Sequence, residues 1–182
     1  ANIVIADNSE YLNKECFEFC KENNFTYIWD GKNHGYGGNI RRLCLASKGN
    51  YLWLLGDDDI VDENVFVKVN DYFNQNKISN YITFSSVTEN YKKITRENER
   101  EGYFKKRVKS ETFLTKDWLS VVFVSANIMY ISDMLYEELL TKKISQVYEN
   151  SVLAYSIIRN SKYVDIINSN TPIDSYTEKL YY

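Results

Sequence analysis

The chain has 182 residues, of which 44% are hydrophobic and 26% are charged, and its formal net charge is −3. This balance is typical of a globular protein and excludes a disordered chain, and the acidic charge argues against nucleic-acid binding through bulk charge. The longest apolar run, around Val121–Val124, is too short to cross a bilayer. The length fits one domain with a sizeable core, so we expect a single domain over residues 1–182.

Apolar runs and turn residues predict alternating strands and helices in the first half of the chain. The expected strands are Ile3–Ala6, Phe25–Trp29, Tyr51–Leu55 and Tyr81–Phe84. Apolar stripes with helical spacing lie between Tyr11 and Cys20, between Ile40 and Leu45, and between Val65 and Phe73. Alternation at these lengths is typical of an α/β fold with a mainly parallel sheet.

The second half of the chain is less regular. Thr88–Lys109 is polar and charged without a sustained apolar period. We expect a solvated loop there, with a mobile lid over a site as the alternative. The later expected elements are a helix at Glu111–Trp118, a strand at Val121–Ile131, a helix from Ser132 to about Lys143, a helix at Glu149–Asn160 and a strand at Tyr163–Ile167.

Acidic side chains follow two of the expected strands. Asp7 comes after the first strand, and residues 57–59 are three consecutive aspartates after the strand Tyr51–Leu55. In open parallel sheets ligands bind outside the carboxyl ends of the strands, so we expect both acidic turns to open on the same side. A divalent cation such as Mg²⁺ or Mn²⁺ relieves the repulsion between adjacent carboxylates and usually shares them with substrate phosphates. A solvated surface turn is the alternative.

A glycine-rich segment at residues 35–38 precedes the helix that contains Arg41 and Arg42. Glycine allows close backbone approach, and a helix N-terminus favours anions, so we expect a loop here that suits a phosphate group. His34 lies beside this segment. An ordinary surface histidine is the simpler interpretation, and contact with a phosphate or sugar is the alternative.

The linked motifs "GYGGN…ASKGNYLWLLGDDD", preceded by a strand ending in "IADNS", resemble the family 2 glycosyltransferases with the GT-A fold. The bacterial sugar transferases of O-antigen and capsule assembly are the most similar members. The resemblance implies a Rossmann-like, three-layer α/β/α sandwich. It also implies an enzyme that uses Mn²⁺ or Mg²⁺ and transfers a sugar, with inversion, from a nucleotide-diphosphate donor to an acceptor hydroxyl in bacterial surface polysaccharide synthesis.

The resemblance assigns roles at the donor side. Asp7 matches the aspartate that hydrogen-bonds the nucleotide base, and Asn39 matches a polar donor near the diphosphate. The other residues that we place at the donor diphosphate are Gly37, Gly38 and Arg42.

The acidic motif of the family commonly reads leucine, Asp, any residue, Asp, Asp. In this chain Gly56 stands where the first aspartate usually is. Asp57 then falls near the ribose, and Asp58 falls at the metal-binding position. Asp59 is kept as the rival metal ligand, because a literal Asp-x-Asp pattern would select it together with Asp57.

Inverting transfer requires a base that takes the proton of the acceptor hydroxyl. The resemblance implies that Glu149, at the start of a late helix, is this catalytic residue. A carboxylate at a helix start is also favourable for dipole reasons alone, which is the alternative. Ser125 and Asn127 could line the acceptor side of the pocket.

The family fold begins with a strand and a helix that have no counterpart here, because Ile3–Ala6 matches the second family strand. We therefore expect weak donor binding and keep open whether the isolated chain is an inactive fragment. The implied partners are a UDP, GDP or dTDP type sugar donor and a saccharide or lipid-linked acceptor, in a cytoplasmic protein. A place at the inner face of the membrane is left open. Peripheral membrane association and a homo-oligomer stay open, and a non-catalytic nucleotide-sugar or metal-binding module or an assembly domain is the alternative function.

Overall fold

The computed structural model describes residues 1–61, 63–75, 77–84, 105–122, 124–133, 137, 149–167 and 174–175. The chain forms two compact units, Ala1–Leu52 with Ile131–Val152, and Trp53–Tyr130 with Leu153–Tyr182. The chain passes between the units three times: within β3 (Tyr51–Trp53), directly after β7 (Asn127–Tyr130) and within α7 (Glu149–Arg159). No helix in the described ranges has the length and apolar character needed to span a bilayer.

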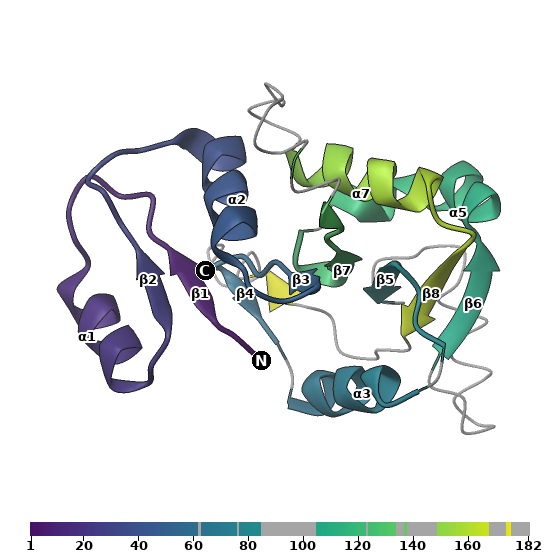
Figure 1. Ribbon diagram of the computed structural model, residues 1–182, viewed down its shortest axis with the longest axis horizontal. Coiled ribbons are helices and arrows are strands. Elements are labelled where there is room, and N and C mark those ends of the chain that lie inside the picture. Colours follow the sequence, from purple (N-terminus) through teal and green to yellow (C-terminus); the bar gives the residue numbers. More distant parts are fainter. Residues whose placement is uncertain are drawn as a thin grey trace, which may run out of the picture. The chain divides into compact units, whose positions relative to one another are not determined.

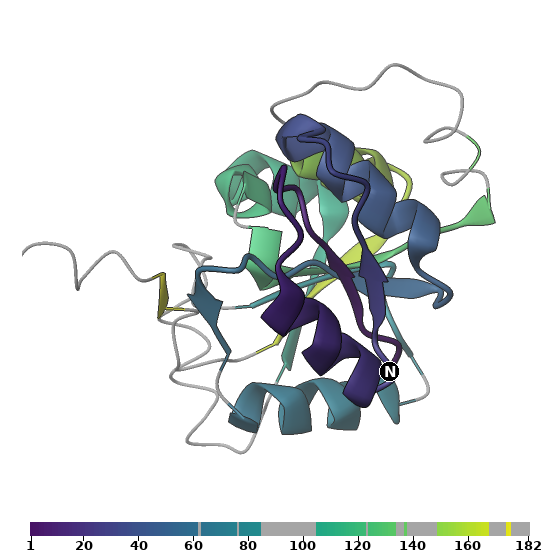
Figure 2. The same cartoon turned by 90° about the vertical axis from the view of Figure 1, so that its left-hand side faces the viewer.

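The first unit contains a parallel strand–helix–strand arrangement. Its main elements are β1 (Val4–Ala6), α1 (Lys14–Glu22), β2 (Thr26–Ile28) and α2 (Gly35–Ala46). β1 and β2 run side by side in parallel, and Ile5 lies opposite Tyr27 (Figure 2). α1 begins where the Asn13 side chain accepts the N–H of Cys16, and it packs on β2, whereas α2 packs on β1. The predicted alternation of short strands and helices is confirmed here.

The glycine-rich segment that was expected as a loop is the first turn of α2. Gly35 has a φ of +68°, a conformation that a residue with a Cβ rarely adopts. A Cβ added at Gly38 would lie 2.9 Å from the Cβ of His34. Glycine at these two positions therefore lets the chain turn into the helix with His34 packed against its first turn, which is why the helix begins earlier than the apolar pattern indicates.

The second unit contains most of the remaining elements. They are β4 (Asp59–Ile60), α3 (Glu63–Phe73), β5 (Tyr81–Phe84), β6 (Lys105–Lys109), α5 (Ser110–Lys116), the 3₁₀ helices η2 (Trp118–Val122) and η3 (Val124–Ala126), β7 (Asn127–Tyr130), β8 (Tyr163–Ile167) and β9 (Asp174–Ser175). β4 and β9 pair antiparallel.

The main sheet is mixed. Its strand order is β3-β7-β5-β8-β6, and β5 is parallel to β8 but antiparallel to β7, while β6 is antiparallel to β8. In Figure 1, α3 lies on one side of the β5–β8–β6 part of the sheet, and α5 and the later turns of α7 lie on the other side. The α/β class is confirmed, but the expectation of a mainly parallel sheet is not met in this sheet. Apolar periodicity marks where strands are, whereas strand direction depends on pairing between distant segments.

The core of the second unit lies on β5 and β8. Its fully buried hydrophobic side chains on these strands are Tyr81, Ile82, Phe84, Val164, Ile166 and Ile167. The indole of Trp53 packs against the rings of Phe66 and Phe84, each at a centroid distance of 5.4 Å. Thr83 and Asp165, which are also fully buried, interrupt this apolar run.

β6 lies in a segment that the sequence indicated as a polar loop. Its Val108 is buried, and the Nε and NH2 atoms of Arg107 donate to the two carboxylate oxygens of Asp165, each at 2.6 Å. The prediction of a loop at Lys105–Lys109 is wrong. The basic residues of this edge strand conceal the alternation of apolar and polar side chains that marks a strand, and lysines are common on such edges. Residues 88–104 of the expected loop lie outside the described residues.

The predicted strand Val121–Ile131 is shorter in the structure. Only Asn127–Tyr130 is a strand, and two 3₁₀ helices precede it. Ser120 stabilises the turn between α5 and η2, because its N–H and hydroxyl both donate to the carbonyl of Asp117. The helix expected after Ser132 lies mostly outside the described residues.

Candidate functional site

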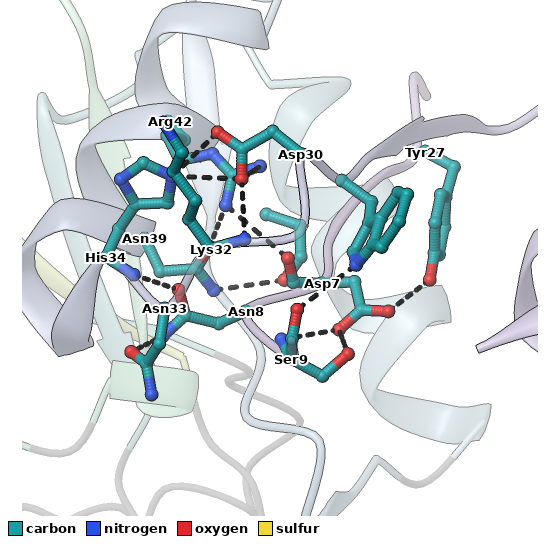
Figure 3. Close-up of polar contacts among 12 residues, drawn as sticks. Asp7, Asn8, Ser9, Tyr27, Asp30, Lys32, Asn33, His34, Asn39 and Arg42 are labelled. Carbon is teal, nitrogen blue, oxygen red and sulfur yellow. Dashed lines mark hydrogen bonds and ion pairs between the residues drawn. The ribbon is translucent and has the colours of Figure 1, made fainter. Parts of the chain in front are cut away.

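Asp7 follows β1 in the first unit, as the sequence predicted. Its N–H donates to the carbonyl of Ile28 at 2.9 Å, which extends the pairing of the two strands. Its Oδ1 accepts the N–H of Ser9 at 2.9 Å and the hydroxyl of Ser9 at 2.6 Å, and its Oδ2 accepts the hydroxyl of Tyr27 (Figure 3). The carboxylate is therefore fixed by donors on both oxygens.

These hydrogen bonds keep the carboxylate ionised. Burial raises the pKa of Asp7, but the hydrogen bonds from Ser9 and Tyr27 lower it more, and the net pKa lies below its ordinary value. Burial, followed by the hydrogen bond to Asp7, raises the pKa of Tyr27 far above its ordinary value. An ionised carboxylate accepts hydrogen bonds only, so Asp7 is suited to an N–H group of a ligand.

Sequence reasoning missed Tyr27. The structure shows the relation: Tyr27 lies opposite Ile5 in the strand pair, and Asp7 comes two residues after Ile5. Residues two apart in an extended chain share a face, so Asp7 and Tyr27 face the same way. That inference requires the register of β1 and β2, which only the structure supplies.

Asn39 and Arg42 connect α2 to the end of β1. The Nδ2 of Asn39 donates to the carbonyl of Ala6 at 3.0 Å. The NH1 of Arg42 donates to the carbonyl of Asp7 and to Oδ1 of Asn39, both at 3.4 Å. Its NH2 is buried, lies 3.8 Å from Asp30 Oδ1 and makes no hydrogen bond within the described part of the chain. Two predicted donor-binding residues therefore lie together beside Asp7.

His34 takes part in a polar network at the start of α2. Its Nε2 lies 2.8 Å from Oδ2 of Asp30, and its N–H donates to Oδ1 of Asn8 at 2.8 Å. The hydrogen bond to His34 is the main reason why the pKa of Asp30 is lowered. Figure 3 shows the His34 ring and the guanidinium of Arg42 both directed toward Asp30. His34 is thus a partly exposed histidine with a partner, and its contact with a phosphate or sugar stays a prediction.

The acidic loop, residues 56–59, lies in the second unit. Asp57 and Asp58 are exposed, and Asp59 is half-buried. A Cβ added at Gly56 would lie 2.7 Å from Oδ1 of Asp58 and 3.0 Å from Oδ2 of Asp59. Both carboxylates therefore occupy space beside Gly56 that a side chain would fill. This is a structural reason for glycine where the family usually has an aspartate.

Glu149 is the first residue of α7 and is only 3% exposed. Burial raises its pKa, the positive charge of Arg41 opposes this, and the net pKa lies above its ordinary value. Glu149 also affects Cys44. The pKa of the Cys44 thiol is raised to about 12, mainly by burial and then by the negative charge of Glu149. A carboxylate with a raised pKa is suited to accept a proton near neutral pH.

The predicted site residues are divided between the two units. Six of them lie in the first unit: Asp7, Gly37, Gly38, Asn39, Arg42 and Glu149. Asp57, Asp58 and Asp59 lie in the second. The first unit brings Asp7, Asn39 and Arg42 into one hydrogen-bonded cluster. A joint site of both groups stays a prediction, as do the donor contacts of Gly37 and Gly38.

A comparison with protein families gives one match that spans both acidic turns. The model for glycosyl transferase family 2 matches residues 2–140, more than half of the chain. The chain belongs to glycosyl transferase family 2. The comparison with curated proteins gave no match. Family membership confirms the resemblance found in the sequence and places the chain among the glycosyltransferases.

Enzymes of glycosyl transferase family 2 typically use a divalent cation. No group of three or more His, Cys, Asp or Glu residues suited to a metal occurs in the described ranges. The acidic loop offers two carboxylate oxygens, from Asp58 and Asp59, that both lie within 3.0 Å of the same point beside Gly56. Mg²⁺ and Mn²⁺ prefer hard oxygen ligands and are usually held by one or two carboxylates plus substrate phosphates. The donor set of this loop fits such a cation.

Proposed function

We propose that this chain is the catalytic domain, with a GT-A fold, of a metal-dependent inverting glycosyltransferase. It transfers a sugar from a UDP, GDP or dTDP type donor to a saccharide or lipid-linked acceptor in bacterial surface polysaccharide synthesis. The observation that carries the proposal is the family 2 match over residues 2–140, which includes Asp7 and the acidic loop. We further propose that residues 1–182 act as one catalytic domain.

The proposed roles at the donor side follow from the contacts of the first unit. Asp7 binds an N–H group of the nucleotide base, and this role is supported by an ionised carboxylate held by Ser9 and Tyr27. Asn39 and Arg42, with Gly37 and Gly38 in the first turn of α2, lie toward the diphosphate. This role is supported by the guanidinium of Arg42, whose NH2 has no hydrogen bond among the described residues.

The proposed roles in the chemistry belong to the acidic loop and to Glu149. Asp57 lies near the ribose, and Asp58 binds Mn²⁺ or Mg²⁺, with Asp59 as its rival. A cation held there would neutralise charge on the leaving nucleoside diphosphate. Glu149 accepts the proton of the acceptor hydroxyl as that oxygen attacks the anomeric carbon, and the raised pKa of its carboxyl supports this role.

Calorimetry against UDP, GDP and dTDP, with and without Mn²⁺, tests the proposal. We expect Mn²⁺-dependent binding of at least one nucleotide, and loss of the Mn²⁺ dependence in Asp58→Ala. Asp71→Ala is the matched control, because Asp71 is an exposed acid on α3 in the same unit. Binding without sugar transfer or donor hydrolysis would favour a non-catalytic binding module. Absence of binding to all three would favour an assembly domain and overturn the proposal.

A further inference from the structure

Ser125 contacts the acidic loop from a distant part of the sequence. It lies in η3, is 3% exposed, and belongs to the same unit as the loop. Its Oγ accepts the N–H of Gly56 at 2.7 Å and donates its proton to Oδ2 of Asp59. One buried hydroxyl therefore joins the start of the loop to the carboxylate at its end.

The hydroxyl is well matched to this position. A serine hydroxyl has one proton to donate and lone pairs that accept. Here the hydroxyl donates its proton to the Asp59 carboxylate, and one of its lone pairs accepts the N–H of Gly56. A hydrogen bond to a carboxylate is stronger than one between neutral groups, so the contact restrains the Asp59 side chain more than a packing contact would.

The backbone of Ser125 is also tied to the chain that leads into the loop. Its carbonyl accepts the indole N–H of Trp53 at 2.7 Å. The Trp53 ring is itself packed between Phe66 and Phe84 in the core of the unit. Ser125 is thereby held by the core at its backbone while its side chain holds the loop.

We propose that Ser125 is a positioning residue of the metal-binding loop. Its hydroxyl holds Asp59 beside Gly56, and the exposed Asp58 is the carboxylate that binds the cation. The inference rests on the proposed function, because it takes the acidic loop as the cation site. The inference favours Asp58 over Asp59 as the metal ligand, because the two carboxylates differ in their surroundings. Asp59 is bonded to the buried hydroxyl of Ser125, and Asp58 faces solvent beside the same glycine.

Three variants of Ser125 separate the role of this hydroxyl from general packing. Ser125→Ala removes it, and Ser125→Thr restores it; Ser125→Cys supplies a weaker donor in case threonine disturbs the fold. Ser120→Ala is the matched control, because Ser120 is 2% exposed in the neighbouring η2 and its hydroxyl donates to the carbonyl of Asp117. Thermal unfolding confirms that each variant is folded.

The first measurement is hydrogen exchange of the Gly56 amide, which does not depend on metal or activity. The second is the dissociation constant of Mn²⁺ in the presence of UDP, GDP or dTDP. We expect faster exchange at Gly56 and Mn²⁺ binding weakened about tenfold in Ser125→Ala, the lower end of the effect of losing a group outside the metal ligands, because Ser125 acts on Asp58 through the loop and not through a bond to it. Nucleotide affinity without metal stays unchanged, and Ser125→Thr recovers both properties.

The outcomes distinguish this inference from the function on which it rests. Wild-type exchange at Gly56 and wild-type Mn²⁺ affinity in Ser125→Ala overturn the role of Ser125 while leaving the proposed function intact. An equal loss of Mn²⁺ affinity in Ser120→Ala also overturns it, because the effect would then be one of packing. If the wild-type chain binds no Mn²⁺ with any of the three nucleotides, the proposed function itself fails.

Discussion

The hydroxyl of Tyr27 donates a hydrogen bond to Oδ2 of Asp7, from one strand of the parallel pair β1–β2 to the residue that follows the other. Asp7 is the residue that we propose to bind the nucleotide base. A tyrosine in β2 therefore helps to orient the carboxylate of Asp7 and, together with Ser9, lowers its pKa.

Tyr27→Phe removes this donor from Asp7. We expect the pKa of Asp7 to rise toward its ordinary value, because burial continues to raise it while one compensating hydrogen bond is lost. We also expect nucleotide affinity to fall, by no more than about tenfold, because the Asp7 carboxylate loses a hydrogen bond that orients it and that contributes about 1.5 kcal/mol. NMR titration of the carboxyl and calorimetry measure the two effects. Tyr11→Phe is the control, because Tyr11 is 84% exposed in the same unit; an unchanged Asp7 pKa in Tyr27→Phe would contradict the prediction.

The lowered pKa of Asp7 also has a consequence for stability. A carboxyl whose pKa is lower in the folded state stabilises the fold above its unfolded pKa, about 3.9, and this contribution is lost as the pH falls through the folded pKa. Below pH 4, Tyr27→Phe should therefore lose less stability with falling pH than the wild type. Urea unfolding at several acidic pH values measures this difference.

Gly56→Ala tests the space that the two carboxylates share. The new Cβ would lie 2.7 Å from Oδ1 of Asp58, at the far end of a flexible side chain, so we expect the carboxylate to move away rather than the fold to break. Mn²⁺ affinity in the presence of nucleotide should fall, with the free energy of unfolding within about 0.5 kcal/mol of wild type. Gly49→Ala is the control, because its Cβ would make only an ordinary contact, 3.5 Å from the carbonyl of Tyr51. Unchanged Mn²⁺ affinity in Gly56→Ala would show that these carboxylate positions are not the ones that bind metal.

Glu149→Gln removes the proposed base. We expect sugar transfer to be abolished while donor binding persists, measured by a transferase assay and by calorimetry. Glu63→Gln is the matched control, since Glu63 is also the first residue of a helix but is exposed. Transfer at a near wild-type rate in Glu149→Gln would remove this residue from the mechanism.

The raised pKa of Glu149 predicts two opposite pH effects. Only the ionised form accepts a proton, so the rate of transfer should rise with pH through the raised pKa. Stability should change the other way, because an acid with a raised folded pKa favours the folded state when it is protonated, and this contribution is lost as the pH rises above the unfolded pKa, about 4.3. Glu149→Gln should abolish that loss of stability, which unfolding curves between pH 4 and 7 can detect.

Arg107→Met tests the ion pair that attaches the edge strand β6 to β8. Asp165 is completely buried, and the variant would leave its carboxylate with Tyr72 as a donor but without the guanidinium. Breaking a buried pair by removing one partner costs about 3–5 kcal/mol, so we expect a loss of stability at the lower end of this range because Arg107 is partly exposed. Denaturant unfolding measures it. Lys109→Met, at an exposed position of the same strand, should change the stability little.

The sequence alone determined the class of fold and the positions of the acidic turns. Short apolar strands such as Tyr81–Phe84 and amphipathic helices such as α3 follow from local periodicity, which depends only on neighbouring residues. Asp7 directly follows β1, whereas β3 ends at Trp53, before the predicted Leu55, and Asp59 is already the first residue of β4. The spacing of these acids with the glycine-rich segment was specific enough to indicate the family. The sequence did not indicate the strand β6. Its contact with the rest of the sheet is made by Val108, a single apolar residue, and by the pairing of Arg107 with a distant carboxylate.

The tertiary structure decided which groups hold the predicted site residues. The partner of Asp7 in β2, the hydroxyl of Ser125 beside Asp59 and the charge of Arg41 near Glu149 all come from segments far along the chain. The mixed direction of the main sheet was decided in the same way. Hydrogen bonds and pKa shifts depend on distances of a few ångströms between such segments, and no local pattern of residues records those distances.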